Sequence, residues 1–323
     1  MSIVVLDQAV VHPQLIALLQ QTFGNRVELV REAIANQQHD YLVLVLWLRH
    51  PSMKVVVKLA GPEAVMASSF TRTAMLHRLV TSHTTINMPE ILAVDVSCRY
   101  FPWRYLIKTY FPGREWWSLR GYLSADEKSE AYRQIGSAVA QLHAIHFPIF
   151  GELALDGSVQ KSTSFLDAFM LRVKKSINSP HLLDIILSLL DQYTPLFQGI
   201  SQPGLCHEDL HAHNILFHRQ HGVWRLSTLL DFDKAWAGTH EIDLARMEFW
   251  RGVIGEAFWP VYTSIIPMDS SYEQRRPIYQ LVWCLEYARS TPEHLRDTQD
   301  LCAQLGLPPI EDFCDISMAP GID

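Results

Sequence analysis

The stretch from Leu205 to Asp231 reads LCHEDLHAHNILFHRQHGVWRLSTLLD, and it decides which fold we expect. Asp209 stands five residues before Asn214, and Asp231 follows seventeen residues after Asn214. The apolar run at 215–217 predicts a strand, residues 218–222 a turn, and residues 223–230 the returning strand. A hairpin of this kind would bring Asp231 back beside Asn214.

The polar residues at these positions match the needs of phosphoryl transfer. A carboxylate such as that of Asp209 can orient an attacking hydroxyl and take up its proton late in the reaction. Carboxamide and carboxylate oxygens, as in Asn214 and Asp231, are ligands that Mg²⁺ prefers. We therefore predict that Asp209 is catalytic and that Asn214 and Asp231 bind the metal. Asp233 is either a further metal ligand or a solvated turn residue.

Composition places the chain among folded proteins. It has 323 residues, of which 48% are hydrophobic and 19% charged, so we do not expect disorder to dominate. The most apolar run, residues 41–48, is too short to span a bilayer as a helix, and the N-terminal residues do not resemble a secretory signal. Five scattered cysteines without CxxC spacing predict reduced thiols. We expect a cytoplasmic protein.

Charge differs between the two parts of the chain. Residues 1–112 contain 10 Lys and Arg against 7 Asp and Glu, whereas residues 113–323 contain 17 against 27. The acidic second part argues against nucleic acid as a partner and favours a cationic small molecule. The alternative is that most of these carboxylates simply solvate helices.

The first 112 residues read as a small lobe with an antiparallel meander. Tight turns between apolar runs predict three consecutive strands, and two more strands follow a helix. The expected helices cover 12–23 and about 63–80, and the expected strands cover 26–34, 41–49, 54–59, 91–96 and 105–111.

The second part, residues 113–323, reads as mainly helical. Ser124 and Glu127 form a capping-box pattern at the start of one helix. Apolar spacing predicts another helix at 164–177, and Ser179-Pro180 is typical of a helix start. Further helices are expected at 240–258, 271–290 and 292–305.

Together these motifs resemble the aminoglycoside phosphotransferase and choline kinase family. Its catalytic loop is similar to His207-Glu-Asp-Leu-His-Ala-His-Asn214, and its metal motif to Asp231-Phe-Asp233 followed by Asp243-Leu-Ala. The resemblance implies an α+β, bilobal, protein-kinase-like fold with a small antiparallel-sheet N-lobe (1–112) and a helical C-lobe (113–323). It implies Mg²⁺-dependent transfer of phosphate from ATP or GTP to a small-molecule hydroxyl, without nucleic-acid or membrane partners. His207 and Asp243 would brace the loop.

The resemblance also implies nucleotide contacts in the first part. Lys58 would bind phosphates, but its usual helix Glu partner is replaced by Thr73, and Glu63 could substitute only if the chain turned back. The segment 33–40 contains no glycine, which leaves Asn36 as the candidate for cradling phosphate. Backbone groups of Thr109 and Phe111 would contact the adenine at a hinge.

The acceptor is the least determined part of the prediction. An aminoglycoside or another antibiotic fits an acidic lobe, while choline, methylthioribose, homoserine or a macrolide stay open. Four carboxylates in the second part could meet ammonium groups: Glu248, Glu256, Asp269 and Glu286. A zinc site built from the histidines at 207, 211 and 213, and a non-catalytic nucleotide binder, are the rival hypotheses.

Overall fold

A computed structural model describes residues 8–38, 40–61, 64, 70–160, 164–289, 291–311 and 313. The chain forms two compact units. The first contains the described residues up to Ser82 together with Asn87–Pro112, and the second contains His83–Ile86 and the described residues from Gly113 onward. The first unit is built on an antiparallel sheet and the second is mainly helical, so the fold is α+β.

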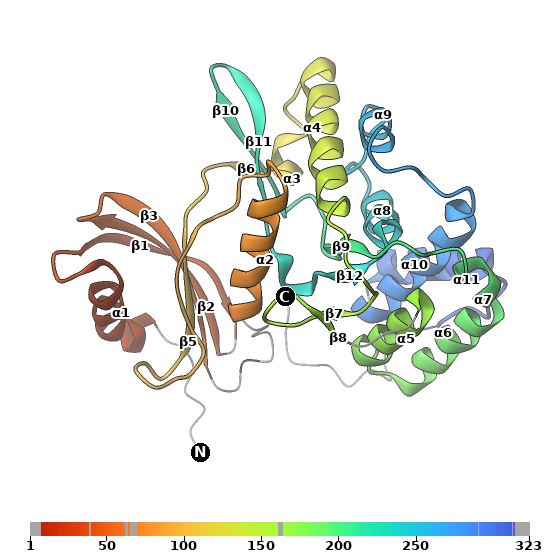
Figure 1. Ribbon diagram of the computed structural model, residues 1–323, viewed down its shortest axis with the longest axis horizontal. Helices are drawn as coiled ribbons and strands as arrows, with labels where there is room; N and C mark the ends of the chain where they lie inside the picture. Colours follow the sequence, from red (N-terminus) through yellow and green to blue (C-terminus); the bar gives the residue numbers. More distant parts are fainter. Residues whose placement is uncertain are drawn as a thin grey trace. The chain divides into compact units, whose positions relative to one another are not determined.

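The first unit is organised around one five-stranded sheet, visible in Figure 1. The strand order is β1-β2-β3-β5-β4, and every neighbouring pair is antiparallel. The strands are β1 (Glu28–Gln38), β2 (Tyr41–Arg49), β3 (Met53–Ala60), β4 (Ile91–Asp95) and β5 (Arg104–Thr109). The meander predicted from the turn spacing is confirmed.

Two helices supply the apolar cover of this sheet. α1 (Gln8–Phe23) packs Leu15 and Leu19 in one core cluster with Val57 of β3. α2 (Phe70–His83) packs Phe70 in a second cluster with Leu106 of β5. Because side chains alternate between the faces of a strand, Leu106 and its partner Lys58 lie on the face opposite Val57.

The first unit differs from the prediction in two places. β1 continues to Gln38, so Asn36 lies on a strand and pairs with Val43 instead of belonging to a loop. The pairing register of β1 with β2 shifts between Ile34 and Asn36, as it does at a β-bulge. The helix expected at 63–80 runs from Phe70 to His83, and Glu63 lies outside the described residues.

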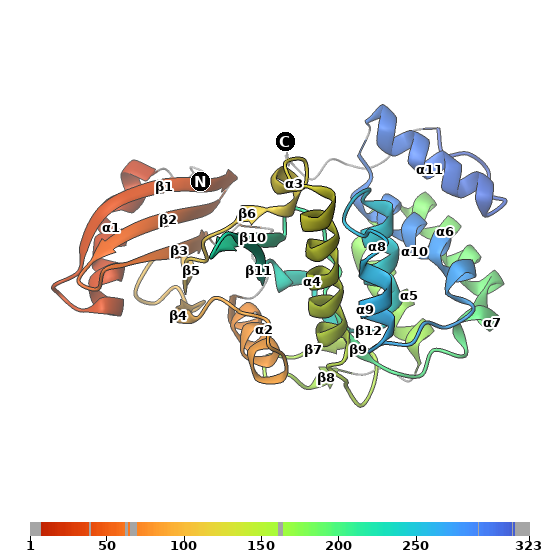
Figure 2. The same cartoon turned by 90° about the horizontal axis from the view of Figure 1, so that it is seen from above.

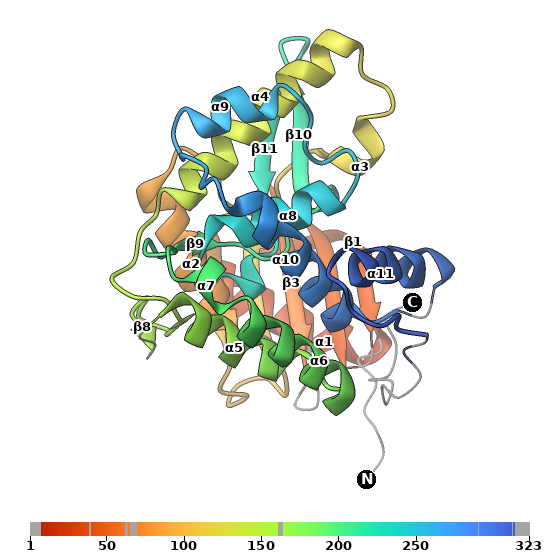
Figure 3. The same cartoon turned by 90° about the vertical axis from the view of Figure 1, so that its right-hand side faces the viewer.

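In the second unit, a hairpin lies along a long helix. β10 (Ile215–Gln220) pairs with β11 (Val223–Leu229) and with the short β6 (Arg114–Glu115). α4 (Ala125–His143) runs beside the hairpin (Figures 1 and 3), and its Gln134 side chain bonds the backbone of β11 twice. The capping box at its start is confirmed. The turn is tighter than predicted: His221 and Gly222 both have positive φ, as a type I′ turn requires.

The other helices of the second unit surround a core that is rich in aromatic rings. The helix predicted at 240–258 begins at the expected residue but is shorter: α8 (His240–Phe249) ends at Phe249, and Gly252 has a φ of 83° before α9 (Phe258–Thr263) begins. Figure 2 shows α8 beside α10. The remaining elements are α3 (Trp116–Leu119), β7 (Glu152–Leu153), β8 (Val159–Gln160), α5 (Phe165–Ser176), α6 (Pro180–Gln192), α7 (Thr194–Phe197), β9 (Gly204–Cys206), η1 (Phe232–Lys234), β12 (Trp236–Gly238), α8 (His240–Phe249), α9 (Phe258–Thr263), α10 (Tyr272–Tyr287) and α11 (Pro292–Gln304).

Candidate active site

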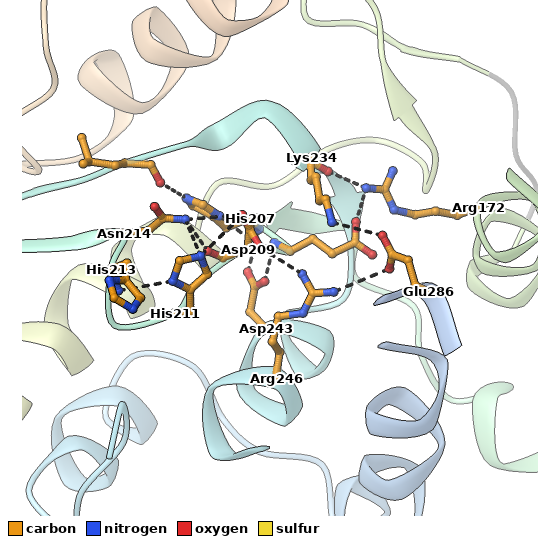
Figure 4. Close-up of polar contacts among 12 residues, drawn as sticks. Arg172, His207, Asp209, His211, His213, Asn214, Lys234, Asp243, Arg246 and Glu286 are labelled. Atoms are coloured by element: carbon orange, nitrogen blue, oxygen red, sulfur yellow. Dashed lines mark hydrogen bonds and ion pairs between the residues drawn. The ribbon is translucent and has the colours of Figure 1, made fainter. Parts of the chain in front are cut away.

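The loop after β9 is held from below by one buried carboxylate. Asp243 of α8 accepts hydrogen bonds from the backbone N–H groups of His207 and Glu208, each at 2.6 Å (Figure 4). It also accepts a bond from His143 Nε2 at 3.0 Å. Burial raises the pKa of Asp243, but the hydrogen bond and charge of His143 outweigh burial and hold that pKa below its ordinary value. The bracing contact expected of Asp243 is confirmed.

His207 uses both ring nitrogens inside the loop. Its Nδ1 accepts from the backbone N–H of Asp209 at 3.2 Å, and its Nε2 lies 2.9 Å from the carbonyl oxygen of Leu230. His213 instead lies 2.7 Å from Glu115. Among the described residues no group of three or more His, Cys, Asp or Glu side chains forms a metal cluster. The geometry of these histidines therefore gives the zinc hypothesis no support.

Asp209 and Asn214 meet across this loop. Asn214 Nδ2 donates to the backbone carbonyl of Asp209 at 2.9 Å and lies 3.4 Å from Asp209 Oδ2. Asn214 Nδ2 also lies 3.2 Å from Nε2 of His211. Burial lowers the pKa of His211, and the charge of Asp209 offsets only part of this effect. A neutral His211 can accept this bond. The amide orientation commits the nitrogen of Asn214 to the loop and makes Oδ1 its candidate metal ligand.

The hairpin returns Asp231 to Asn214, as the spacing predicted. The backbone N–H of Leu230 donates to the carbonyl of Asn214 at 2.8 Å. Asp231 has a φ of 66° and Glu208 a φ of 62°, both in the left-handed region that non-glycine residues avoid. Such strain gathers at functional sites. Asp233 follows in η1 and, like Asp231, is half-buried.

A network of ion pairs, which the sequence reasoning missed, extends from Asp209. Arg246 Nη1 lies 3.6 Å from Asp209 Oδ1, and Arg246 Nη2 lies 3.6 Å from Glu286 Oε2. Lys234 Nζ lies 3.2 Å from the other oxygen of Glu286. Figure 4 shows this chain of contacts beside the loop that contains Asp209. Arg246 stands one helical turn after Asp243, a spacing that places both on one face and that could have identified it.

A second arginine holds the residue next to Asp209. Arg172 of α5 forms an ion pair with Glu208, bonds Glu152 at 2.5 Å, and donates to the carbonyl of Lys234 at 2.6 Å. Burial raises the pKa of Glu208, with Arg172 opposing the rise. Nothing in the sequence relates position 172 to position 208, so only the packing of α5 shows this pair.

The predicted nucleotide residues belong to the first unit. Lys58 is half-buried on β3, between Val43 and Leu106 of the neighbouring strands. Thr73 is buried in α2, the helix that packs on the same face of the sheet. The N–H of Thr109 donates to the carbonyl of Glu90 at 2.9 Å, so that group is committed to the sheet. Phe111 follows β5 and is half-buried.

The four carboxylates considered for ammonium groups have different surroundings. Glu286 is paired with Lys234 and Arg246. Glu248 accepts from Tyr272 and lies near Arg276, and Asp269 is paired with Arg275. Glu256 is exposed. Three of the four therefore already have a cationic neighbour.

Comparison with known families agrees with this geometry. Residues 34–262 match the model of the phosphotransferase enzyme family. The chain belongs to that family. The match begins within β1 and extends through the loop at 207–214, the hairpin and α8. The resemblance recognised from the motifs is thus confirmed, whereas a search of curated proteins found no match.

Solved structures share the fold of this phosphotransferase family member. A putative fructosamine-3-kinase from Haemophilus somnus 129PT aligns with a TM-score of 0.64 and 17% identity over 90% of this chain and 96% of its own. An apo thermostable mutant of aminoglycoside phosphotransferase APH(4)-Ia gives 0.61 and 15% identity over 90% and 96%. ADP-bound aminoglycoside phosphotransferase APH(2'')-Ib gives 0.62 and 17% over 94% and 100%. Among the described residues, no helix has both the length and the apolarity needed to cross a membrane.

Proposed function

We propose that this protein transfers the γ-phosphate of ATP or GTP to a hydroxyl group of a small molecule. The observation that carries the proposal is the meeting of three predicted residues. One loop holds Asp209 and Asn214 in contact, and the β10–β11 hairpin bonds Leu230, the residue before Asp231, to the backbone of Asn214. Phosphoryl transfer depends on positioning and charge stabilisation, and a braced loop of this kind supplies positioning.

Asp209 is the proposed catalytic residue. Its side chain is about one quarter exposed, at 27%, while the loop beneath it is buried. A carboxylate in this setting can accept a hydrogen bond from the acceptor hydroxyl and take the proton as the phosphate bond forms. The neighbouring contacts to Arg246 and Asn214 restrict its rotation.

The donor set fits Mg²⁺. Asn214 Oδ1 and the carboxylates of Asp231 and Asp233 would hold the ion, because Mg²⁺ prefers hard oxygen ligands. When bound, the ion would neutralise charge on the nucleotide phosphates. The protein's own contribution is the strained backbone at Asp231 and the fixed amide of Asn214.

The nucleotide side of the proposal rests on Lys58, Asn36, Thr109 and Phe111. Lys58 stands on the sheet face that α2 covers, and a lysine there would bind phosphates as a point charge. Neighbours of this fold have been solved with ADP and with GDP. Either purine nucleotide is therefore included in the proposal.

The acceptor expected from the sequence is an aminoglycoside-type or other antibiotic. Structural neighbours have been solved with hygromycin B and with kanamycin, and another is described as a putative fructosamine-3-kinase. A small metabolite such as choline, methylthioribose or homoserine is the alternative. The paired carboxylates described above argue against a polycationic acceptor.

An acceptor screen tests the proposal. Full-length protein is incubated with Mg²⁺, ATP or GTP, and aminoglycosides, macrolides, choline, methylthioribose, homoserine and simple sugars. We expect a product carrying one added phosphate, and its absence with Asp209→Asn, which should still bind nucleotide. Turnover retained by Asp209→Asn would refute the catalytic assignment. Nucleotide binding without product across the panel would favour the non-catalytic hypothesis.

A further inference from the structure

Three carboxylates near the proposed catalytic loop form ion pairs with cations of the chain itself. Glu208 and Glu152 both contact Arg172. Glu286 lies 3.2 Å from Lys234 and 3.6 Å from Arg246. Leaving out Asp209, this network contains equal numbers of cations and carboxylates among the described residues. The three cations are Arg172, Lys234 and Arg246, and the three carboxylates are Glu152, Glu208 and Glu286.

The charge states strengthen this balance. Burial raises the pKa of Glu286, but Lys234, Arg246 and Arg172 outweigh burial and hold that pKa below its ordinary value. Glu286 is therefore ionised at neutral pH, and its negative charge balances one of its two cationic neighbours. Burial raises the pKa of Glu208, and the Glu208–Arg172 pair carries no net negative charge in either protonation state of the acid.

A cavity of about 560 Å³ adjoins this network in the second unit. Arg172, which contacts Glu208, is one of its walls and lies over the ring of Trp236 at 5.0 Å. Leu171 and Val159 add apolar surface, and Lys175 adds a second cation. The volume is that of a small-molecule site. Among the described lining residues, these two cations outnumber the single carboxylate, Glu152.

A polycation would gain little from such surroundings. Ammonium groups bind where carboxylates are unpaired, and here they would have to displace Arg172 or Lys234. Displacing Arg172 would leave a largely buried guanidinium without its partner, which is strongly unfavourable. An uncharged or acidic molecule meets no such penalty and can use the apolar wall.

We propose that the acceptor carries no net positive charge and is a neutral or acidic hydroxyl compound whose body occupies the cavity beside Arg172. This inference rests on the proposed phosphotransfer. It replaces the cationic acceptor expected from the acidic composition of the second part. The reason is that Glu152, Glu208 and Glu286 are paired with cations of the chain.

The first test compares acceptors by charge. With full-length protein and Mg²⁺-nucleotide, kcat/KM is measured at subsaturating concentrations for glucose, glucuronate, glucosamine, kanamycin and hygromycin B, and for each acceptor that the screen identifies. We expect the best acceptor to be neutral or acidic and at least about tenfold better than kanamycin or hygromycin B. The inference is overturned if kanamycin, hygromycin B or the cationic glucosamine is the best acceptor.

The second test changes charge at the cavity with a matched control. Lys175 lines the cavity, whereas its exposed neighbour Lys174 does not. Lys175→Gln should raise kcat/KM for kanamycin relative to the best neutral acceptor about threefold to fivefold, since one like charge is removed at close range. Lys174→Gln should change this ratio less than about twofold. Equal effects of the two variants would show that the acceptor does not occupy this cavity.

Calorimetry separates failure of this inference from failure of the proposed function. Kanamycin is titrated into the full chain with Mg²⁺-ADP at low and high salt. We expect no saturable binding below about 1 mM. Binding with a Kd below about 10 µM that weakens with salt would overturn the charge inference even if no acceptor is ever phosphorylated. Absent turnover with every acceptor would count against the proposed function alone.

Discussion

Arg246 is a buried cation with long contacts. It is 3% exposed, yet its two ion pairs are both 3.6 Å long, and its Nε and Nη1 have no hydrogen-bond partner among the described residues. Its guanidinium also lies over the ring of Trp283 at 5.6 Å. A buried cation held so loosely is costly, which indicates a role in positioning Asp209.

Replacing Arg246 should therefore affect turnover more than nucleotide binding. Arg246→Met is expected to lower kcat about 10-fold to 100-fold, because a small displacement of a catalytic group has effects of this order. The KM for nucleotide should change less than about twofold. Steady-state kinetics with Arg246→Lys, which keeps the charge, should recover part of the loss. An unchanged kcat in Arg246→Met would show that the residue only fills space.

Asp243 should be essential for the fold of the catalytic loop. It is fully buried, at 0% exposure, and its oxygens accept bonds from His207, Glu208 and His143. An asparagine offers one acceptor oxygen and turns an amide towards backbone donors. Asp243→Asn should lower the free energy of unfolding by about 2–4 kcal/mol, measured by urea denaturation. The exposed Asp184→Asn in α6 is the control and should change it by less than about 0.5 kcal/mol.

At the scale of elements, a buried ion pair fixes α8 to α10. Arg275 contacts Glu241 through two bonds of 2.5 and 2.7 Å, and both side chains are about 2% exposed. Tyr279 adds a third bond to Glu241 at 3.0 Å. Because α8 carries Asp243 and α10 carries Glu286, this pair sets the spacing between the loop brace and the ion network.

Breaking this pair on one side should be costly. Glu241→Gln is expected to lower the free energy of unfolding by about 3 kcal/mol, since it removes the buried counter-charge of Arg275 and leaves only Asp269, whose side chain is 45% exposed. Glu273→Gln is the matched control, because its ion pair with Arg276 is largely exposed and should contribute less than about 1 kcal/mol. Similar denaturation midpoints for the two variants would contradict the role assigned to the buried pair.

His240, the first residue of α8, should make the stability of the fold depend on pH. Burial, with a smaller contribution from the charge of His143, lowers the pKa of His240 to about 3. As pH falls below about 6.5, the unfolded chain takes up a proton at this histidine before the folded chain does, so folding loses stability down to about pH 3. The slope from one such group approaches about 1.4 kcal/mol per pH unit.

Urea denaturation between pH 7 and pH 5 measures this effect. His240→Gln should flatten the pH dependence by about one proton's contribution, whereas His181→Gln, at an exposed position of α6, should leave it unchanged. An identical slope in the wild type and in His240→Gln would refute the assignment.

At the scale of the whole molecule, Mg²⁺-nucleotide should stabilise the chain by linkage. A ligand at 100 times its Kd adds about 2.7 kcal/mol to the free energy of unfolding, which calorimetry reports as a higher Tm. Asp209→Asn should keep this gain, and Asp231→Asn should lose the part that requires Mg²⁺. Lys58→Ala should lose part of the gain with or without Mg²⁺. Equal shifts in all four proteins would remove these residues from the nucleotide site.

Local patterns predicted most of the elements because their causes are local. The capping box of Ser124 and Glu127, the N-cap at Ser179 and the alternating strand β2 all depend on neighbours in the sequence. The two incorrect element boundaries also have local causes, which the spacing of apolar residues does not show. The strand β1 continues through polar residues with a shift of register at a bulge. Gly252 interrupts the helical spacing of apolar residues between α8 and α9.

The family, the reaction class and the candidate phosphate chemistry could be predicted from the sequence, because motif residues from Asp209 to Asp231 are close in the chain and joined by one hairpin. The pairing of charges at the candidate site could be seen only in the folded chain. Arg172, Lys234 and Glu286 come from separate elements, and composition counts their charges without showing which are paired. A carboxylate next to a guanidinium and one next to water contribute equally to net charge, but only the second attracts an ammonium group.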